Sequence, residues 1–403
     1  MIIALFLPLC YPARMSDFLK LSVPAEIDTA LQKNGITVPT PVQREVVPRI
    51  LSGAHTAFQS ETGTGKTLCY LIPAFMRRRK GAITTLILAP THELGSQIRQ
   101  TAANLASDSG LPVTAALCIG GAPLKRQIES LKKKPDILIG GPARILELVR
   151  IKKFSPRDIE LVVLDEVDRL LSPEMRDLVA ELLSLLPATA QYVSCSATLT
   201  TRHSDILSSI VPSGSALERI EMPAENVLAQ NIAHWAFYSE RRNKIDSLRR
   251  FLVAEKPGKA LIFTAELGQV ENIASQLVHK GISCVALHAK MDKKDRKTAI
   301  DRFRSGKITV LVTSDLAARG LDIPDITHVI QMDVQENTDF FIHRSGRTAR
   351  AGKNGINAIF GDEYELRSLA RLEKKLGIII YPKALYGGNI VTPEQETPEE
   401  RDQ

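Results

Sequence analysis

Short, uninterrupted apolar runs alternate along the chain with longer amphipathic stretches, and this alternation occurs twice. In the first half the candidate strands lie at residues 84–89, 114–119, 137–139, 161–164 and 192–194. In the second half they lie at residues 260–263, 284–287, 310–313, 328–332 and 357–360. Apolar runs without polar alternation are typical of parallel strands that helices cover on both faces. The pattern therefore predicts an α/β fold with two mostly parallel sheets.

A loss of this periodicity at residues 212–231, where Gly and Pro also occur, predicts a boundary between two domains. A chain of 403 residues is also too long for one ordinary core, so two domains are expected. We expect an upstream extension at 1–15, an N-terminal domain at 16–220, a linker at 221–231, a C-terminal domain at 232–385 and a disordered acidic tail at 386–403. The extension is inferred because Met15 precedes the first recognisable pattern, at Phe18.

Composition limits the partners without fixing an activity. The formal net charge of +7 favours anionic partners such as nucleic acid or nucleotides. The five cysteines have no metal-ligand spacing, which favours free buried thiols in a reducing cytoplasm. The longest apolar run is shorter than the ~20 residues that a membrane span needs. We expect a cytoplasmic protein that does not enter a membrane.

The sequence SETGTGKT at residues 60–67 is a Walker A pattern with serine at its first position. Gly63 and Gly65 allow the backbone to wrap a phosphate chain, and the following helix N-terminus supplies positive potential. Lys66 can reach the β- and γ-phosphates, and Thr67 can ligate Mg²⁺. The alternative is an ordinary Gly/Thr-rich turn before a helix.

The stretch LVVLDEVDRL at residues 161–170 ends an apolar run with three acids in four positions. Ionised carboxylates this close to a core need a positive partner. If Mg²⁺-ATP binds the glycine-rich loop, Asp165 would hold the metal, through water, and Glu166 would orient or deprotonate the attacking water. Asp168 is too distant for the same role. A solvated acid cluster at a strand end is the alternative.

The sequence HRSGRTAR at residues 343–350 carries candidate cations for a transferred phosphate. Arg347 and Arg350 are three positions apart and share one face of a helix. Because they lie far from the glycine-rich loop in sequence, we predict arginine fingers that act when two domains close. The alternative is a solvated basic face.

Taken in order, these segments resemble the DEAD-box family of ATP-dependent RNA helicases, from Phe18 to about Tyr381. The resemblance implies two RecA-like domains in tandem. GITVPTPVQ at residues 35–43 resembles the Q motif of the family, which implies that Gln43 reads the adenine edge and selects ATP. Ile36 stands where the family usually has an aromatic residue, which weakens the expected stacking on the base.

The same resemblance assigns further roles in the first half. SETGTGKT corresponds to motif I, which implies that the nucleotide is bound by Thr62, Gly63, Thr64, Gly65, Lys66 and Thr67. DEVD corresponds to the DEAD motif, with Val167 in place of alanine. SAT at residues 196–198 resembles motif III. In the family this motif bonds the last acid of motif II, which implies that Asp168, Ser196 and Thr198 couple hydrolysis to domain closure.

Three segments of the first half resemble the RNA-facing motifs of the family: PTHEL at 90–94, a glycine pair and GPAR at 141–144. They imply RNA contacts at Pro90, Thr91, Gly120, Gly121 and Arg144. His92, Gly141 and Ala143 depart from the arginine, threonine and glycine of the family. Each departure removes or alters a contact to the RNA backbone, so we expect weaker RNA binding than in a consensus member.

The second half resembles the remaining motifs. ALIFTAE at 260–266 resembles motif IV, HAKMDKKDR at 288–296 an RNA-contacting motif, TSDLAARGLD at 313–322 motif V, and HRSGRTAR motif VI. They imply RNA contacts at Arg296 and Ser314, coupling roles for Asp315 and Arg319, a bond from Asp322 to the ribose, and catalytic roles for Arg347 and Arg350 beside Lys66, Asp165 and Glu166.

The implied activity is RNA-stimulated ATP hydrolysis with Mg²⁺, coupled to domain closure and to local unwinding of short RNA duplexes or remodelling of RNA–protein complexes. Little sequence specificity is expected. We expect a monomer, with protein partners left open. The main alternative is an RNA clamp or scaffold with weak ATPase activity. A DNA-directed or protein-translocating relative and a metabolic P-loop kinase fit the motif order less well.

Overall fold

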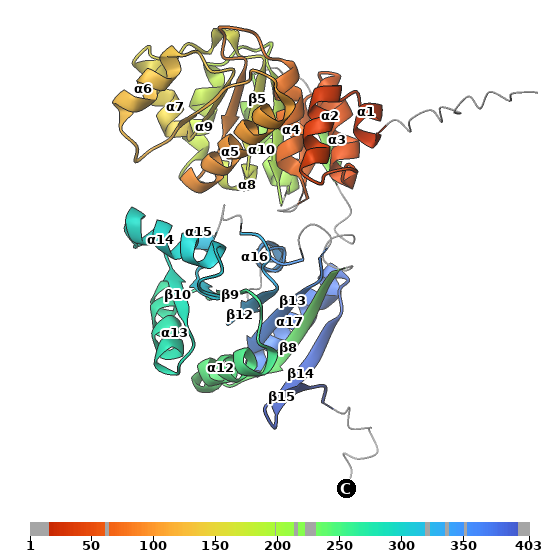
Figure 1. Ribbon diagram of the computed structural model, residues 1–403, viewed down its shortest axis with the longest axis vertical. Coiled ribbons are helices and arrows are strands. Elements are labelled where there is room, and N and C mark those ends of the chain that lie inside the picture. Colours follow the sequence, from red (N-terminus) through yellow and green to blue (C-terminus); the bar gives the residue numbers. More distant parts are fainter. Residues whose placement is uncertain are drawn as a thin grey trace, which may run out of the picture. The chain divides into compact units, whose positions relative to one another are not determined.

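A computed structural model describes residues 16–60, 64–197, 199–212, 217–221, 231–318, 323–334, 338–349 and 353–393. The chain divides into two compact units, each built around one sheet with flanking helices (Figure 1). The predicted extension at 1–15 and most of the predicted linker, 222–230, lie outside the described residues. In the part of the chain that is described, no helix is both long and apolar enough to cross a bilayer.

The first unit contains a seven-stranded sheet in the order β3-β4-β2-β5-β6-β1-β7. Its strands are β1 (Thr56–Gln59), β2 (Thr85–Leu88), β3 (Ala115–Cys118), β4 (Ile137–Gly140), β5 (Leu161–Asp165), β6 (Gln191–Ser196) and β7 (Glu218–Glu221). The ladders from β3 to β6 are parallel. The five strands predicted in this half are confirmed. The strands β1 and β7 were not among the predicted strands, because TAFQ and ERIE lack the continuous apolar run that marks the others.

Helices and short 3₁₀ turns connect these strands. They are α1 (Asp17–Lys20), α2 (Ala25–Lys33), α3 (Pro41–Leu51), α4 (Lys66–Met76), α5 (His92–Ser109), α6 (Leu124–Lys132), α7 (Pro142–Arg150), η1 (Pro156–Asp158), α8 (Val167–Leu170), α9 (Arg176–Ser184) and α10 (Thr201–Ile210). Thr40 caps α3 and Thr91 caps α5, each accepting a backbone N–H of the first turn. Apolar side chains of β2, β4 and β5 form the core against these helices.

The second unit contains an eight-stranded sheet in the order β10-β11-β9-β12-β13-β8-β14-β15. Its strands are β8 (Ile232–Tyr238), β9 (Ala260–Phe263), β10 (Cys284–Leu287), β11 (Val310–Thr313), β12 (His328–Gln331), β13 (Gly355–Gly361), β14 (Ile380–Tyr386) and β15 (Asn389–Val391). Its helices are η2 (Arg241–Asn243), α12 (Lys244–Glu255), α13 (Leu267–His279), α14 (Lys293–Arg304), α15 (Asp315–Ala318), α16 (Thr338–Ser345) and α17 (Glu363–Leu376). All five strands predicted in this half are present.

The two sheets have the same strand order over their first seven positions, with β8 of the second at the place of β1 of the first. This repetition agrees with two RecA-like domains in tandem. In a parallel α/β sheet, ligands bind at the carboxyl ends of the strands. The loops that follow β1, β2, β4 and β5 therefore meet at one edge of the first sheet.

The predicted start of the disordered tail, residue 386, is wrong. The strand β15 (Asn389–Val391) pairs antiparallel with β14, with Tyr386 opposite Asn389. Gly387 and Gly388 both have positive φ values and form the tight turn between the strands. The prediction rested on the polar, acidic composition of the tail and did not consider the Gly-Gly pair. Residues 394–403 lie outside the described residues.

Candidate active site

The glycine-rich loop enters α4 at Gly65, whose φ of +88° lies in the left-handed region. The Nε2 atom of Gln43 donates a hydrogen bond to the Gly65 carbonyl at 3.1 Å, and its Oε1 atom accepts from the Thr40 N–H. A Cβ atom at position 65 would lie 2.3 Å from that Nε2. Only glycine fits here, for both reasons. Gln43, predicted to read adenine, thus also holds the loop that leads into α4.

Four donors surround the carboxylate of Asp165, the last residue of β5, which is fully buried. The Oδ1 atom accepts from the Glu166 N–H at 2.9 Å and from the Cys195 thiol at 3.2 Å, and it lies 3.8 Å from Lys66 Nζ. The Oδ2 atom accepts from the Tyr70 hydroxyl at 2.7 Å. The positive partner that the structure gives the acid cluster is therefore Lys66, whereas the sequence pointed to Mg²⁺ in this place.

The electrostatics of this cluster keep Lys66 charged and keep Tyr70 and Cys195 neutral. Burial disfavours the charged ammonium, but the attraction of Asp165 and other nearby acids outweighs it, and the pKa of Lys66 is raised. Burial and the neighbouring Asp165 carboxylate raise the pKa of Tyr70 and of Cys195 well above their usual values. Both side chains therefore act as neutral hydrogen-bond donors, and Cys195 is not a thiolate nucleophile.

Sequence reasoning missed Tyr70 and Cys195. The signal for Tyr70 was available, because Lys66 and Tyr70 are four residues apart on α4 and share one helix face. Cys195 lies opposite Asp165 in the parallel ladder of β5 and β6. That register cannot be read from the sequence alone.

Glu166 has a φ of +52°, an unusual conformation for a residue that is not glycine. It lies between β5 and the short helix α8 (Val167–Leu170). Backbone strain of this kind is found most often at functional sites. Asp168, in the first turn of α8, is half-buried, and its charge contributes to the raised pKa of Lys66. Ser196 is fully buried at the end of β6, where its carbonyl accepts the Ser60 N–H at 2.8 Å.

The predicted RNA-facing residues of the first half follow three adjacent strands. Pro90 and Thr91 follow β2, the pair Gly120 and Gly121 follows β3, and Arg144 lies in α7 after β4. Because the order β3-β4-β2 is contiguous and parallel, these residues lie at one sheet edge. Arg144 Nη1 donates to the Ala122 carbonyl at 3.2 Å, which ties α7 to the β3 loop.

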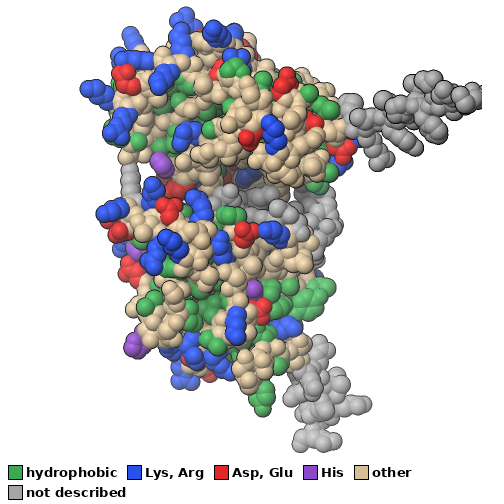
Figure 2. Space-filling view, in the orientation of Figure 1, with side chains coloured by type: hydrophobic (Ala, Val, Ile, Leu, Met, Phe, Trp, Pro, Cys, Tyr) green, Lys and Arg blue, Asp and Glu red, His purple; other side chains and the backbone are tan. Residues whose placement is uncertain are grey.

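Charge on the visible face is mixed. Figure 2 shows Lys and Arg side chains over both units with Asp and Glu side chains between them. A modest net charge of +7 agrees with this distribution. The overall positive charge is therefore too small to account for RNA binding alone. Individual main-chain and side-chain groups at the strand ends have to contribute contacts to the RNA backbone.

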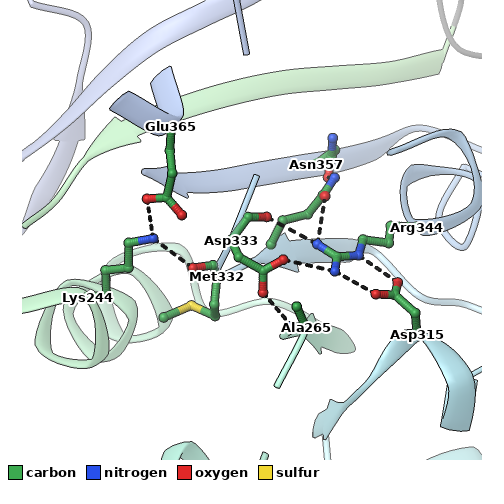
Figure 3. A network of polar contacts seen from close by, with 9 residues as sticks. Lys244, Ala265, Asp315, Met332, Asp333, Arg344, Asn357 and Glu365 are labelled. Atoms are coloured by element: carbon green, nitrogen blue, oxygen red, sulfur yellow. Dashed lines mark hydrogen bonds and ion pairs between the residues drawn. The ribbon is translucent and has the colours of Figure 1, made fainter. Parts of the chain in front are cut away.

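A buried arginine organises the second unit (Figure 3). Arg344, in α16, is 1% exposed, and its Nε and Nη2 atoms each donate to one oxygen of Asp315 at 2.7 Å. Its Nη2 also donates to Asp333 Oδ1 at 3.0 Å, and its Nη1 to Gln331 Oε1 at 3.3 Å. Burial opposes the charge, but hydrogen bonds to Asp315 and the Asp333 charge raise the pKa of Arg344. Asp315 was predicted as a coupling residue; Arg344 was not predicted.

The remaining predicted residues are distributed as follows. Arg347 is buried, one turn after Arg344, and its N–H donates to the Arg344 carbonyl at 3.1 Å. Arg296, in α14, donates from Nη2 to the Ala317 carbonyl at 3.0 Å, and Ser314 is buried after β11. Six predicted site residues lie outside the described residues: Thr62, Gly63, Thr198, Arg319, Asp322 and Arg350.

Known proteins resemble this chain in both of its halves. The family described as DEAD/DEAH box helicase matches residues 40–206, and the helicase conserved C-terminal domain matches residues 243–352. The DEAD-box ATP-dependent RNA helicase CshC of Bacillus cereus is 33% identical over 93% of this chain and 95% of its own length. The probable ATP-dependent RNA helicase YfmL of Bacillus subtilis is 34% identical over 89% and 94%.

Solved structures agree with these matches. Mss116p bound to single-stranded RNA and AMP-PNP has a TM-score of 0.78 and 25% identity, covering 95% of this chain and 82% of that one. Dbp5 of S. cerevisiae, bound to RNA and ADP BeF3, shares the fold with a TM-score of 0.81 at 24% identity, covering 92% and 96%. With two family domains in order and relatives that match over nearly their whole length, the chain belongs to the DEAD-box family of ATP-dependent RNA helicases.

Proposed function

We propose that this chain hydrolyses ATP in response to RNA and uses domain closure to separate short RNA duplexes or to remodel RNA–protein complexes. In this proposal residues 16–220 form the ATP-binding domain and residues 232–385 the second helicase domain, joined by the linker at 221–231. The observation that carries the proposal is the buried carboxylate of Asp165, held by Lys66, Tyr70, Cys195 and the Glu166 N–H at the end of β5.

The donor set fits Mg²⁺. Asp165 and the half-buried Thr67 offer hard oxygen atoms, which this ion prefers. Both oxygens of Asp165 already accept hydrogen bonds, which supports contact with the ion through water. When bound, Mg²⁺ would neutralise charge on the β- and γ-phosphates. We propose Thr67 and Asp165 as the residues that hold it.

The other catalytic roles follow from position. Lys66, which stays charged, would bind the β- and γ-phosphates, with Thr62, Gly63, Thr64 and Gly65 around the phosphate chain. Glu166, in its strained conformation beside Asp165, would orient or deprotonate the attacking water. Gln43 has one amide hydrogen and one oxygen lone pair left after its two hydrogen bonds, enough to read adenine.

Residues of the second unit complete the proposed mechanism. Arg347 and Arg350 would contact the γ-phosphate in the transition state, and Asp322 would bond the ribose. Asp168, Ser196 and Thr198 would couple hydrolysis to closure, as would Asp315 and Arg319. The two hydrogen bonds between Asp315 and the buried Arg344 support a fixed geometry for this part of the site.

We propose that RNA contacts residues that follow the carboxyl ends of strands in both sheets. The contacts are Pro90, Thr91, Gly120, Gly121 and Arg144 in the first unit, and Arg296 and Ser314 in the second. Main-chain groups and small residues contact phosphate and sugar, which carry no base identity. Low sequence specificity follows. We also propose a cytoplasmic monomer, with protein partners left open. Sedimentation tests the monomer, and cell fractionation tests the location.

Steady-state ATPase of the wild type and of Glu166→Gln, with and without generic single-stranded RNA or matched DNA, tests the proposal. We expect stimulation by RNA only, and its loss in the variant. A flat response while RNA still binds in the presence of ATP would refute the proposal and favour an RNA clamp with weak ATPase activity. Stimulation by DNA to the same degree would refute the RNA preference.

A further inference from the structure

A line of buried polar side chains continues from Arg344 into the second sheet. Gln331 Nε2, in β12, donates to Asn357 Oδ1, in β13, at 3.0 Å, and Asn357 Nδ2 lies 3.0 Å from His234 Nδ1, in β8. Gln331, Asn357 and His234 are at most 2% exposed. We call these three residues the relay. Asn357 and His234 are direct neighbours in the ladder, so they project from one face of the sheet.

The direction of every hydrogen bond in the relay is set by Arg344. A guanidinium only donates, so Gln331 must present its oxygen to Arg344 and its amide nitrogen to Asn357. Asn357 then presents its own oxygen to Gln331 and donates to His234, whose Nδ1 accepts. Reversing any one amide would leave two donors or two acceptors face to face. The relay therefore has one satisfied arrangement, and buried networks of this kind fix geometry.

The relay contacts α16 at two places. Gln331 accepts a hydrogen bond from Arg344. The His234 ring packs against Phe341, which lies one helical turn before Arg344, and the two ring centroids are 5.5 Å apart. Arg344 in turn accepts the N–H of Arg347 through its carbonyl oxygen. The position of Arg347 is thus joined to the sheet through Arg344 and the side chain of Gln331.

We propose that His234, Asn357 and Gln331 are positioning residues that hold α16 and the following turn in the one arrangement that aims Arg347 at the γ-phosphate. The inference rests on the proposed role of Arg347. Asp315 and Asp333 bind the Nε and Nη2 edge of Arg344, whereas Gln331 Oε1 and the Asp333 carbonyl bind Nη1. Losing the Gln331 oxygen removes one of these two acceptors of Nη1 and leaves the Asp333 carbonyl to hold that edge of the guanidinium.

The test uses near-isosteric substitutions, Gln331→Met and, independently, Asn357→Leu. We expect kcat for RNA-stimulated ATP hydrolysis to fall about tenfold while the KM for ATP stays within about twofold, because a contact made only in the transition state affects kcat. Ser239→Ala is the matched control. Ser239 is also buried at the end of β8 but bonds Ser247 of α12, so its loss should lower the melting temperature without changing kcat.

A second comparison separates positioning from general damage to the domain. In an Arg347→Ala background, Gln331→Met should lower kcat no further, because the relay acts through Arg347. If the two substitutions together lower kcat by the product of their separate effects, the proposal is overturned, and so it is if kcat is unchanged in both Gln331→Met and Asn357→Leu.

If Arg347→Ala itself leaves RNA-stimulated kcat unchanged, the proposed role of Arg347 fails and the relay proposal with it. If only Arg347→Ala lowers kcat, the relay proposal alone is overturned. Each variant is assayed below the onset of its own melting curve.

Discussion

Removing one hydroxyl oxygen, in Tyr70→Phe, tests how the Asp165 carboxylate is held. The ring stays in its buried place, and the 2.7 Å hydrogen bond to Asp165 Oδ2 is lost, together with a hydrogen bond to the Thr67 side chain. A hydrogen bond to a charged group contributes about 1.5–3 kcal/mol, so we expect the free energy of unfolding of the first unit to fall by about 2 kcal/mol. For a unit of roughly 200 residues this lowers the melting temperature by about 4–8 °C.

Differential scanning calorimetry of the whole chain measures this change, with Tyr192→Phe as the matched control. Tyr192 is equally buried in the same unit, but its hydroxyl reaches only the neutral Pro187 carbonyl at 3.5 Å. Its loss should cost less than about 1 kcal/mol. Tyr70→Phe should also raise the Mg²⁺ concentration that gives half-maximal ATPase, since Asp165 is less firmly held. Equal shifts in the two variants, or no shift in either, would refute the reasoning.

Three further predictions concern the loop, a thiol and RNA. Gly65→Ala should abolish ATP binding in a nucleotide titration, because its Cβ meets Gln43, whereas Gly53→Ala, with a similar φ and open space, should keep it. Burial raises the pKa of Cys118 to about 11, against about 8.5 unfolded. As the pH rises, the Cys118 thiol therefore loses its proton in the unfolded chain before it does so in the folded chain. Urea unfolding should show that the free energy of unfolding falls between about pH 8.5 and 11, and that it falls less in Cys118→Val. His92→Arg should tighten RNA binding and steepen its logarithmic salt dependence by about 0.7; an unchanged slope would contradict the predicted backbone contact.

The sequence was most informative where one short stretch contains both an apolar run that predicts a strand and polar residues that predict a binding site. The apolar run at 161–164 predicted a buried strand, and the acids after it predicted a binding site that begins at Asp165. SETGTGKT predicted a phosphate-binding loop from its Walker A spacing. The ion pair between Lys66 and Asp165 was not predicted, because Mg²⁺ was the expected partner of the acids. The ten predicted strands were recovered because continuous apolar runs are a local signal.

Contacts set by strand register could not be predicted in this way. Cys195 reaches Asp165 only because β5 and β6 pair as Asp165 opposite Cys195. Likewise, nothing in the sequence places His234 beside Asn357, which lie 123 positions apart. Helix spacing would have revealed Tyr70 but not these two pairs.

Arg344 illustrates a different limit. It stands inside HRSGRTAR, where charge and helical spacing directed attention to Arg347 and Arg350, the arginines expected to act on the phosphate. The structure instead buries Arg344 between two carboxylates and an amide. A fully buried guanidinium is costly unless every donor finds a partner, and those partners come from two segments, the start of α15 and residues 331–333 at the end of β12. Their convergence on one side chain implies that the segment carrying Arg347, a proposed catalytic arginine, is held by its own core. The relay is the part of that core which single substitutions can test.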